Sequence, residues 1–147
     1  MLNITILCVG KLKEKYWTDA ALEYIKRLSK YCVLQIDELK ESEPVSEGAA
    51  IIKRVKNEDY VIALEITGEG LDSVELSEKI KELAITGRSR IVFVIGGSDG
   101  FSKDVSERAD RLLSFSKMTF PHQMMRVILL EQLYRSFKII NNEKYHK

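Results

Sequence analysis

The chain has 147 residues, of which 31% are charged and 45% hydrophobic, and its formal net charge is +1. This length and this ordinary mix of residues predict one soluble globular domain over residues 1–147. The apolar run near the start, within residues 2–9, is too short for a membrane span, which needs roughly 20 apolar residues. No basic segment precedes this run as it would in a signal peptide, and we expect a cytoplasmic protein.

The charges are unevenly distributed along the chain. Residues 11–30 hold six Lys or Arg against three Asp or Glu, residues 37–82 hold six against thirteen, and residues 117–147 hold six against two. Basic ends of this kind indicate a polyanion-binding face, although a solvated helix face explains any single cluster about as well. Cys8 and Cys32 are expected to be free buried thiols. No Cys/His cluster has the spacing of metal ligands, so no metal site is predicted.

Two strands and two helices are predicted in the first part of the chain. A near-continuous apolar run with β-branched residues, residues 2–9, predicts a strand covered on both faces. Apolar residues then recur at helical spacing over residues 17–31. A second, weaker strand is predicted at residues 32–39. It is followed by a helix at residues 44–56, whose first residue is a proline that suits the first turn.

The middle of the chain predicts a strand and a capped helix. Residues 60–66 form an apolar run that is closed by Thr-Gly-Glu-Gly. Asp72 is placed to cap the next helix while the side chain of Glu75 reaches back to the backbone, which is the pattern of a capping box. Apolar residues continue one face of this helix until Gly87 ends it.

The last third of the chain begins with the strongest strand pattern, Arg-Ile-Val-Phe-Val-Ile at residues 90–95. Apolar residues over 105–113 predict a helix, and residues 114–120 predict either a short fifth strand or an extended loop. A final helix is expected from Pro121 to about Ile140. Strands that alternate with helices in this way predict an α/β fold, a parallel sheet sandwiched by helices.

The final helix is apolar on more than one side, whereas a surface helix needs a single apolar stripe. We expect one stripe to pack on the sheet of the same chain and the other to pack on a partner chain, which predicts a homodimer. The first stripe is Val127, Leu130, Leu133, Tyr134, Phe137 and Ile140, and the second is Met124, Met125, Ile128 and Leu129.

Ligands of open α/β sheets bind beyond the carboxyl ends of the strands. Two of these ends, at residues 64–70 and 95–100, are rich in glycine, which lets the backbone approach a ligand closely. Neither matches the dinucleotide fingerprint or a P-loop. This favours a nucleoside-like ligand held by backbone groups over a phosphate cradle, although plain strand-to-helix turns explain the glycines equally well.

The two histidines differ in their surroundings. His122 directly follows a proline in the first turn of the final helix, where a structural role is more common than proton transfer. His146 lies between Tyr145 and Lys147 at the end of the chain. Composition alone favours a solvated terminus for His146.

Several segments resemble one known family. The opening "ITILCVGKLKEKYW", the loop in "VFVIGGSDG", the run "LSFSKMTFPHQMMRVILLEQLYRSFKI" and the closing "YHK" are similar to the ribosomal RNA large subunit methyltransferase H family, of the SPOUT class. The resemblance covers essentially the whole chain. The segment at residues 41–50 looks shorter than in other members, and it lies away from these motifs.

The resemblance implies an enzyme that uses S-adenosylmethionine to methylate N3 of pseudouridine 1915 in helix 69 of 23S rRNA, acting on the assembled ribosome or large subunit. It implies a trefoil knot in the C-terminal half, an exception to the rule that protein chains are not knotted, and a homodimer. The implied cofactor-binding residues are Leu64, Gly96, Gly97, Gly100, Phe115, Ser116, Lys117, Met118, Thr119 and Phe120.

The resemblance also implies that the carboxyl-terminal tail reaches toward the cofactor pocket of the partner. His146 and Tyr145 are then the candidate catalytic residues, and Arg126 and Lys147 the candidate contacts to substrate RNA. Two other interpretations stay open from the residues. One is a SPOUT methyltransferase that acts on another RNA such as tRNA, and the other is a non-enzymatic RNA-binding module.

Overall fold

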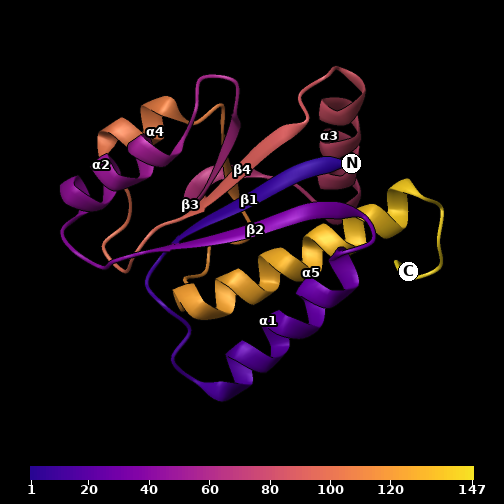
Figure 1. The fold of residues 1–147 in the computed structure, drawn as a ribbon, viewed down its shortest axis with the longest axis horizontal. Coiled ribbons are helices and arrows are strands. Elements are labelled where there is room, and N and C mark those ends of the chain that lie inside the picture. The colour runs from indigo at the N-terminus through magenta and orange to yellow at the C-terminus, as the bar shows by residue number, and fades with distance from the viewer.

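Five parallel strands form one sheet between two layers of helices in the computed structural model, which describes residues 1–147 (Figure 1). The order across the sheet is β2-β1-β4-β3-β5. The strands are β1 (Leu2–Val9), β2 (Cys32–Leu39), β3 (Tyr60–Gly70), β4 (Arg90–Ile95) and β5 (Arg111–Ser114). The helices are α1 (Lys15–Leu28), α2 (Pro44–Arg54), α3 (Ser73–Ile85), α4 (Lys103–Arg108) and α5 (His122–Ile140). The predicted α/β fold is confirmed.

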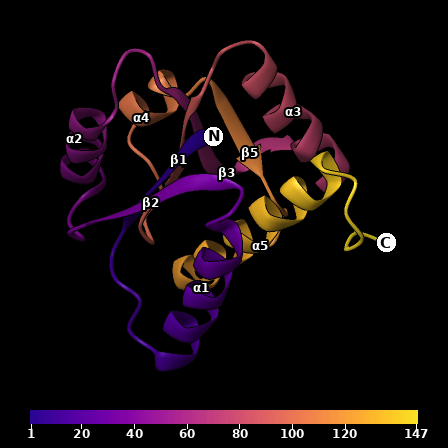
Figure 2. The same ribbon diagram turned by 45° about the vertical axis from the view of Figure 1, so that its right-hand side comes forward.

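The helices divide between the two faces of the sheet. Helices α1 and α3 both pack against α5 on one face, and α2 packs against α4 on the other. The turned view of Figure 2 separates the two layers. None of the helices is long and apolar enough to cross a membrane.

Strand β4 shows why the central strands are apolar throughout. Ile91, Phe93 and Ile95 pack into the core under α1, α3 and α5, whereas Val92 and Val94 pack into the smaller core under α2 and α4. Successive side chains of a strand point to opposite faces, so a strand covered on both faces needs apolar residues at every position.

The position predicted for the end of the fourth helix was wrong. The pattern over residues 105–113 predicted a helix, but α4 ends at Arg108, and Leu112 and Leu113 lie in β5 beside β3. Of the two possibilities for residues 114–120, the loop is correct beyond Ser114. A pair of adjacent leucines fits either period, and the pairing with β3 decides between them.

Three local predictions are confirmed. The capping box of α3 is present in both directions, with the Asp72 carboxylate 2.7 Å from the amide of Glu75 and the Glu75 carboxylate 2.9 Å from the amide of Asp72. Helix α5 begins at His122, directly after Pro121. Cys8 and Cys32 are free and buried, and burial raises the pKa of each thiol to about 11.

Strand β3 makes an excursion halfway along its length. Leu64 and Glu69 both pair with Leu113 of β5, so the four residues between them leave the ladder. Gly68 permits this path, because a β-carbon at that position would lie 2.7 Å from the backbone of Leu112. The excursion places residues 65–68 at the edge of the sheet where the strands end.

Candidate functional site

A cavity of about 710 Å³ lies beyond the carboxyl ends of β3, β4 and β5, which are neighbours in the sheet. The loop that follows β5 and the first turn of α5 close its other side. Proteins bind small ligands in cavities of roughly 300–1,000 Å³, most often at this edge of a parallel sheet. The cavity is therefore the candidate ligand site.

The structure brings nine of the ten residues proposed for cofactor binding around this one cavity. Lys117 is the exception and does not line it. The nine are Leu64, Gly96, Gly97, Gly100, Phe115, Ser116, Met118, Thr119 and Phe120. Three segments far apart in the sequence thus meet at one place.

The cavity has further lining residues, of which the sequence predicted some and missed others. Glu65, Ile66 and Thr67 of the β3 excursion line the cavity, as do Phe101 and His122. The predicted ligand-binding strand end at residues 64–70, which includes the Thr-Gly-Glu-Gly run, already covered Glu65, Ile66 and Thr67, whereas Phe101 was not predicted and His122 was expected to be structural. The pairing of two β3 segments with the same residue of β5 cannot be read from that run.

The glycines of the loop after β4 also have structural roles. A β-carbon on Gly96 would lie 2.8 Å from the ring of Phe101, so Gly96 makes room for that ring. Gly100 has φ +81°, a conformation that suits glycine, and its amide donates to the carbonyl of Gly97 at 3.2 Å. The glycines therefore shape the cavity wall through Phe101 and a tight turn.

Internal hydrogen bonds hold the loop between β5 and α5. The Ser114 hydroxyl donates to the carbonyl of Ser116 at 2.9 Å, and the Ser116 hydroxyl accepts from the amide of Met118 at 2.9 Å. These bonds fix the backbone of the segment that forms one cavity wall. A backbone held in advance binds a ligand with less loss of entropy.

The chemistry of the cavity wall is mostly neutral. Glu65 and His122 are its only charged or titratable side chains, and no lysine or arginine lines it. Such a wall does not suit a phosphate, which proteins bind with cations or helix N-termini. It suits a neutral ring system, and Glu65 adds an attraction for positive charge.

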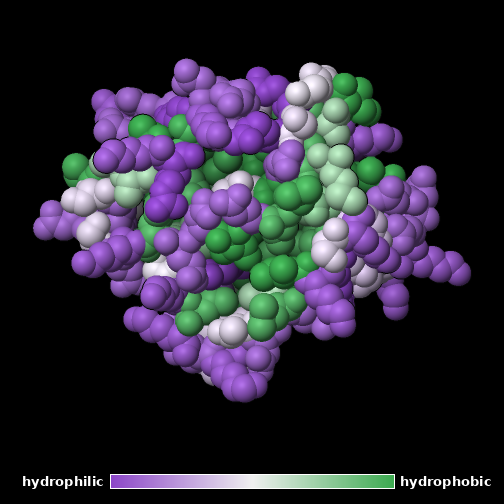
Figure 3. Space-filling view, in the orientation of Figure 1, coloured by the Kyte–Doolittle hydropathy of each residue, from purple (hydrophilic) through white to green (hydrophobic).

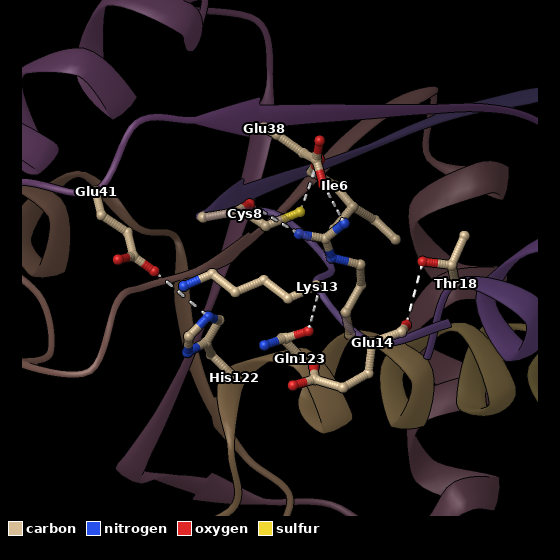
Figure 4. Close-up of polar contacts among 11 residues, drawn as sticks. Ile6, Cys8, Lys13, Glu14, Thr18, Glu38, Glu41, His122 and Gln123 are labelled. Carbon is tan, nitrogen blue, oxygen red and sulfur yellow. Dashed lines mark hydrogen bonds and ion pairs between the residues drawn. The ribbon is translucent and has the colours of Figure 1, made fainter. Parts of the chain in front are cut away.

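His122 stands between the cavity and the end of β2. Its Nε2 lies 3.7 Å from Oε1 of Glu41 and is buried without a hydrogen-bond partner. Figure 4 shows the ring of His122 directed toward the Glu41 carboxylate. Gly10, with φ +94°, leaves the space in which these two side chains meet, since a β-carbon there would lie 2.7 Å from Oε1 of Glu41.

Arg126 lies inside the protein, not on its surface. It is 3% exposed. One guanidinium nitrogen donates to Oε2 of Glu38 at 2.6 Å, and the other donates to the carbonyl of Gly10 at 3.0 Å. Direct contact of Arg126 with RNA, as expected from the resemblance, is therefore not favoured. Its bonds instead tie α5 to the ends of β1 and β2.

The carboxyl-terminal tail folds back on the distal half of α5. The Tyr145 hydroxyl donates to Oε2 of Glu131 at 2.7 Å, and its ring stands 5.0 Å from that of Tyr134 in an edge contact. A guanidinium nitrogen of Arg135 lies 3.1 Å from Nδ1 of His146. Because a guanidinium only donates, Nδ1 accepts this bond in a neutral imidazole.

The tail is remote from the cavity of its own chain. Glu131 and Arg135, which hold it, follow the cavity residue His122 by nine and thirteen positions. A helix rises about 1.5 Å per residue, so these anchors lie roughly 14–20 Å along α5 from His122. Within a single chain the structure does not bring His146 and the cavity together.

Comparison with known proteins agrees with this architecture. The family model described as predicted SPOUT methyltransferase matches residues 2–146. The putative ribosomal RNA large subunit methyltransferase H of Methanococcus vannielii is 54% identical, with 99% of this chain and 100% of that protein covered. The ribosomal RNA large subunit methyltransferase H of Clostridium novyi is 53% identical at the same coverage. This chain belongs to the ribosomal RNA large subunit methyltransferase H family of SPOUT methyltransferases.

A solved structure extends the comparison to other SPOUT folds. The TrmH/SpoU tRNA modifying enzyme of A. aeolicus superposes with a TM-score of 0.50 at 12% identity, covering 97% of this chain and 78% of that one. At this identity the likeness concerns the fold alone. The alignments with the methyltransferase H relatives run over 159 positions, more than this chain has residues, so the present member is the shorter one.

Proposed function

We propose that the protein is an S-adenosylmethionine-dependent methyltransferase of large-subunit ribosomal RNA. The observation that carries this proposal is the cavity at the ends of β3, β4 and β5, with apolar walls, no lysine or arginine and one carboxylate, Glu65. It occurs in a chain whose relatives at 52–54% identity are named as ribosomal RNA large subunit methyltransferases.

The residues present fit this cofactor. Its adenosine is neutral and suits backbone groups and apolar side chains such as Leu64 and Phe115. Its positive sulfonium and amino groups suit a site with a carboxylate and no competing cation. When bound, the cofactor supplies an electrophilic methyl group, and the main task of the protein is to orient the attacking nitrogen.

The specific substrate that we propose is N3 of pseudouridine 1915 in helix 69 of 23S rRNA, in the large subunit or assembled ribosome. Methylation there forms a carbon–nitrogen bond, breaks a carbon–sulfur bond and releases the N3 proton. A general base that takes this proton typically adds ~10²–10⁴-fold to the rate. We also propose that the chain around the cavity is threaded as a trefoil knot.

The proposed proton acceptor is His146 of the other subunit in a homodimer. The tail is held roughly 14–20 Å along α5 from the cavity of its own chain. If it takes part in catalysis, it therefore acts at the cavity of the partner chain. To accept a proton at Nδ1, His146 has to give up its bond from Arg135, which is 3.1 Å long. RNA phosphate is a competing partner for that guanidinium.

Tyr145 has a supporting role in this proposal. Its hydrogen bond to Glu131, together with partial burial, raises the pKa of Tyr145 to about 12. At neutral pH the phenol therefore stays protonated and does not act as a base. Its ring and hydroxyl hold the tail against α5, which positions His146.

The proposed dimer explains an apolar face of the single chain. Met124 and Ile128 of α5 are only half-buried, and Leu22 of α1 is exposed. Figure 3 shows hydrophobic side chains gathered over the start of α5 on this face. Leu129, which was predicted to belong to the partner-facing stripe, is fully buried in the core of its own chain. The partner-facing stripe is thus narrower than predicted.

We expect the protein to sediment as a dimer, about twice 16.9 kDa, at micromolar concentration. An apolar patch of this kind on a free monomer is unusual for a soluble protein. Analytical ultracentrifugation measures the mass directly. A monomer at these concentrations would remove both the interface and the shared active site from the proposal.

Gly96→Val should abolish cofactor binding and leave the fold intact. A β-carbon at this position would lie 2.8 Å from the ring of Phe101, so the valine side chain displaces that ring into the cavity. Calorimetric titration with S-adenosylmethionine checks binding, and circular dichroism checks folding. Gly70→Val is the matched control, because no atom lies within 4 Å of a β-carbon there. Normal binding by folded Gly96→Val would place the cofactor elsewhere.

The function itself is tested by methyl transfer from labelled cofactor to ribosomes, large subunits, deproteinised rRNA and tRNA. We expect label in 23S rRNA of the assembled particles, and mapping of the labelled nucleotide tests the position. Label in tRNA alone would favour the other SPOUT activity. Failure to bind the cofactor at hundreds of micromolar would favour a non-enzymatic RNA-binding module.

A further inference from the structure

The burial of Arg126 raises the question of which cations near the cavity meet the substrate. An RNA-modifying enzyme gains much of its affinity from lysines and arginines that contact phosphates. Arg126 is 3% exposed and engaged with Glu38 and Gly10. The rim of the cavity therefore has to offer other cations. The candidates are exposed Lys11 and Lys13, between β1 and α1, and exposed Lys15, at the start of α1.

We propose that Lys11, Lys13, Lys15 and Tyr16, here called the lysine strip, bind the RNA strand next to the target nucleotide. The lysines would contact phosphates and Tyr16 would stack on an unpaired base. This inference rests on the proposed function, since it names the surface that the rRNA substrate contacts. All four side chains are exposed.

The segment between β1 and α1 holds Lys11 and Lys13, and Lys15 is the first residue of α1. Exposed Lys11, Lys13 and Lys15 alternate with half-buried Leu12 and Glu14, and Leu12 packs against the main core. The packing of Leu12 into the core leaves its two neighbours, Lys11 and Lys13, exposed to solvent.

The lysines are available for a new partner. Lys11 and Lys13 form no ion pair within 4.0 Å, and Lys15 pairs only with Asp19 on the exposed surface of α1. Exposed pairs of this kind contribute little and exchange readily for phosphate. One carboxylate lies near the lysine strip where the strip approaches the cavity. It is Glu41, whose side chain is 51% exposed and lies beside His122 in Figure 4.

The strip begins at the rim of the cavity. The amide of Lys13 donates to Oε1 of Gln123 at 2.8 Å, and Gln123 follows His122, which lines the cavity. Figure 4 shows the side chain of Lys13 extending past Gln123 toward His122 and Glu41. An RNA strand that binds along the lysine strip therefore leads directly to the mouth of the cavity.

Tyr16 adds an aromatic surface beside these cations. It is 64% exposed, and its ring meets that of Trp17 edge to face at 5.0 Å between centroids. The edge contact leaves a face of Tyr16 open. Proteins that bind single-stranded or looped RNA place aromatic rings among lysines in this way, so that unpaired bases stack on them.

RNA suits this surface better than a second copy of the chain does. Unpaired lysines are depleted from protein interfaces, because burying them costs their hydration. Two free ammonium groups beside Tyr16 fit a polyanion instead. The half-buried apolar residues on α5 give the second copy a different surface.

The test replaces the three lysines together, as Lys11→Gln/Lys13→Gln/Lys15→Gln. Binding to large ribosomal subunits is measured at several salt concentrations. Removing one phosphate contact should reduce the slope of log K against log salt by about 0.7, so the slope of the triple variant should fall by roughly 2. We expect its KM for subunits to rise at least about tenfold while its dissociation constant for S-adenosylmethionine stays unchanged.

The matched control is Lys53→Gln/Lys81→Gln/Lys103→Gln, which removes the same charge from exposed sites on α2, α3 and α4. If control and strip variants show the same salt slope and KM, the effect is one of net charge and the proposal is wrong.

Tyr16→Ala should weaken binding roughly 5- to 100-fold, and Tyr16→Phe should restore it. A change in sedimenting mass for Tyr16→Ala would instead assign Tyr16 to a protein interface and overturn its stacking role.

The experiment can contradict the lysine-strip proposal and the proposed function independently of each other. If the wild-type protein binds subunits with a slope that the strip variant lowers but transfers no methyl group, the activity is wrong and the strip stands as an RNA-binding surface. If the wild-type protein methylates rRNA and the strip variant matches it in slope and KM, only the strip is wrong.

Discussion

Replacing His146 by alanine should reduce methyl transfer on the order of 10²-fold, the loss expected when a general base is removed. Folding, dimer mass and cofactor binding should stay at their wild-type values, because His146 is exposed and makes one side-chain hydrogen bond, with Arg135 at 3.1 Å. Single-turnover transfer at saturating cofactor and subunits measures the chemical step. Full turnover by the alanine variant would return the tail to a solvated terminus.

The contacts of the tail determine which of its residues to change. Tyr145 packs on Tyr134 and bonds to Glu131, so deleting it removes structure as well as chemistry. Tyr145→Phe keeps the ring and loses only the hydroxyl bond, and its effect on rate should be smaller than that of His146→Ala. Lys147→Ala should weaken binding to subunits in a salt-dependent way, because a lysine on a phosphate acts through charge.

Mixed dimers show whether the tail acts across the interface. The Gly96→Val chain keeps its tail but not its cofactor site, and the His146→Ala chain keeps its cofactor site but not its tail base. In a symmetric dimer each chain contributes the same surface, so random mixing makes about half of the dimers heterodimers, each with one complete site. About a quarter of wild-type activity should return. No recovery in verified heterodimers would mean that the tail does not act in trans.

Replacing Arg126 by methionine should lower the free energy of unfolding by about 3 kcal/mol, near the lower end of the cost of breaking a buried ion pair. The reason is the double engagement of its guanidinium, with Glu38 at 2.6 Å and the Gly10 carbonyl at 3.0 Å. The loss stays at the low end because Glu38 is 34% exposed and water can hydrate it. Urea unfolding at neutral pH measures the difference.

The control is Lys103→Met, which breaks the exposed pair with Glu107 on α4 and should change stability by no more than about 0.5 kcal/mol. A double variant that adds Glu38→Gln to Arg126→Met should lose less than the two single changes together, because each single change already breaks the shared bond. Additive losses would show that the pair is not coupled, and an Arg126→Met variant as stable as wild type would show that the buried bonds contribute nothing.

Local sequence patterns correctly predicted the elements that depend only on residues close together in the chain. The apolar run of β4 and the capping box of α3 follow from strand and helix geometry alone, and both appear as expected. Leu112 and Leu113 mark the limit of such patterns. Adjacent leucines satisfy a helical or a strand period, and only pairing with β3 makes them β5.

The amino-acid sequence by itself determined that glycine-rich loops follow the third and fourth strands, which suited either a ligand site or plain turns, and the resemblance to a known family added the run after β5. The surroundings of single charged residues were decided only by the tertiary structure. In the local sequence pattern Arg126 is simply one basic residue on a helix. In the structure it bonds to Glu38 and Gly10, which are 88 and 116 residues away in the chain. Long-range partners of this kind leave no periodic trace, because the fold, and not the local chain, brings them within reach.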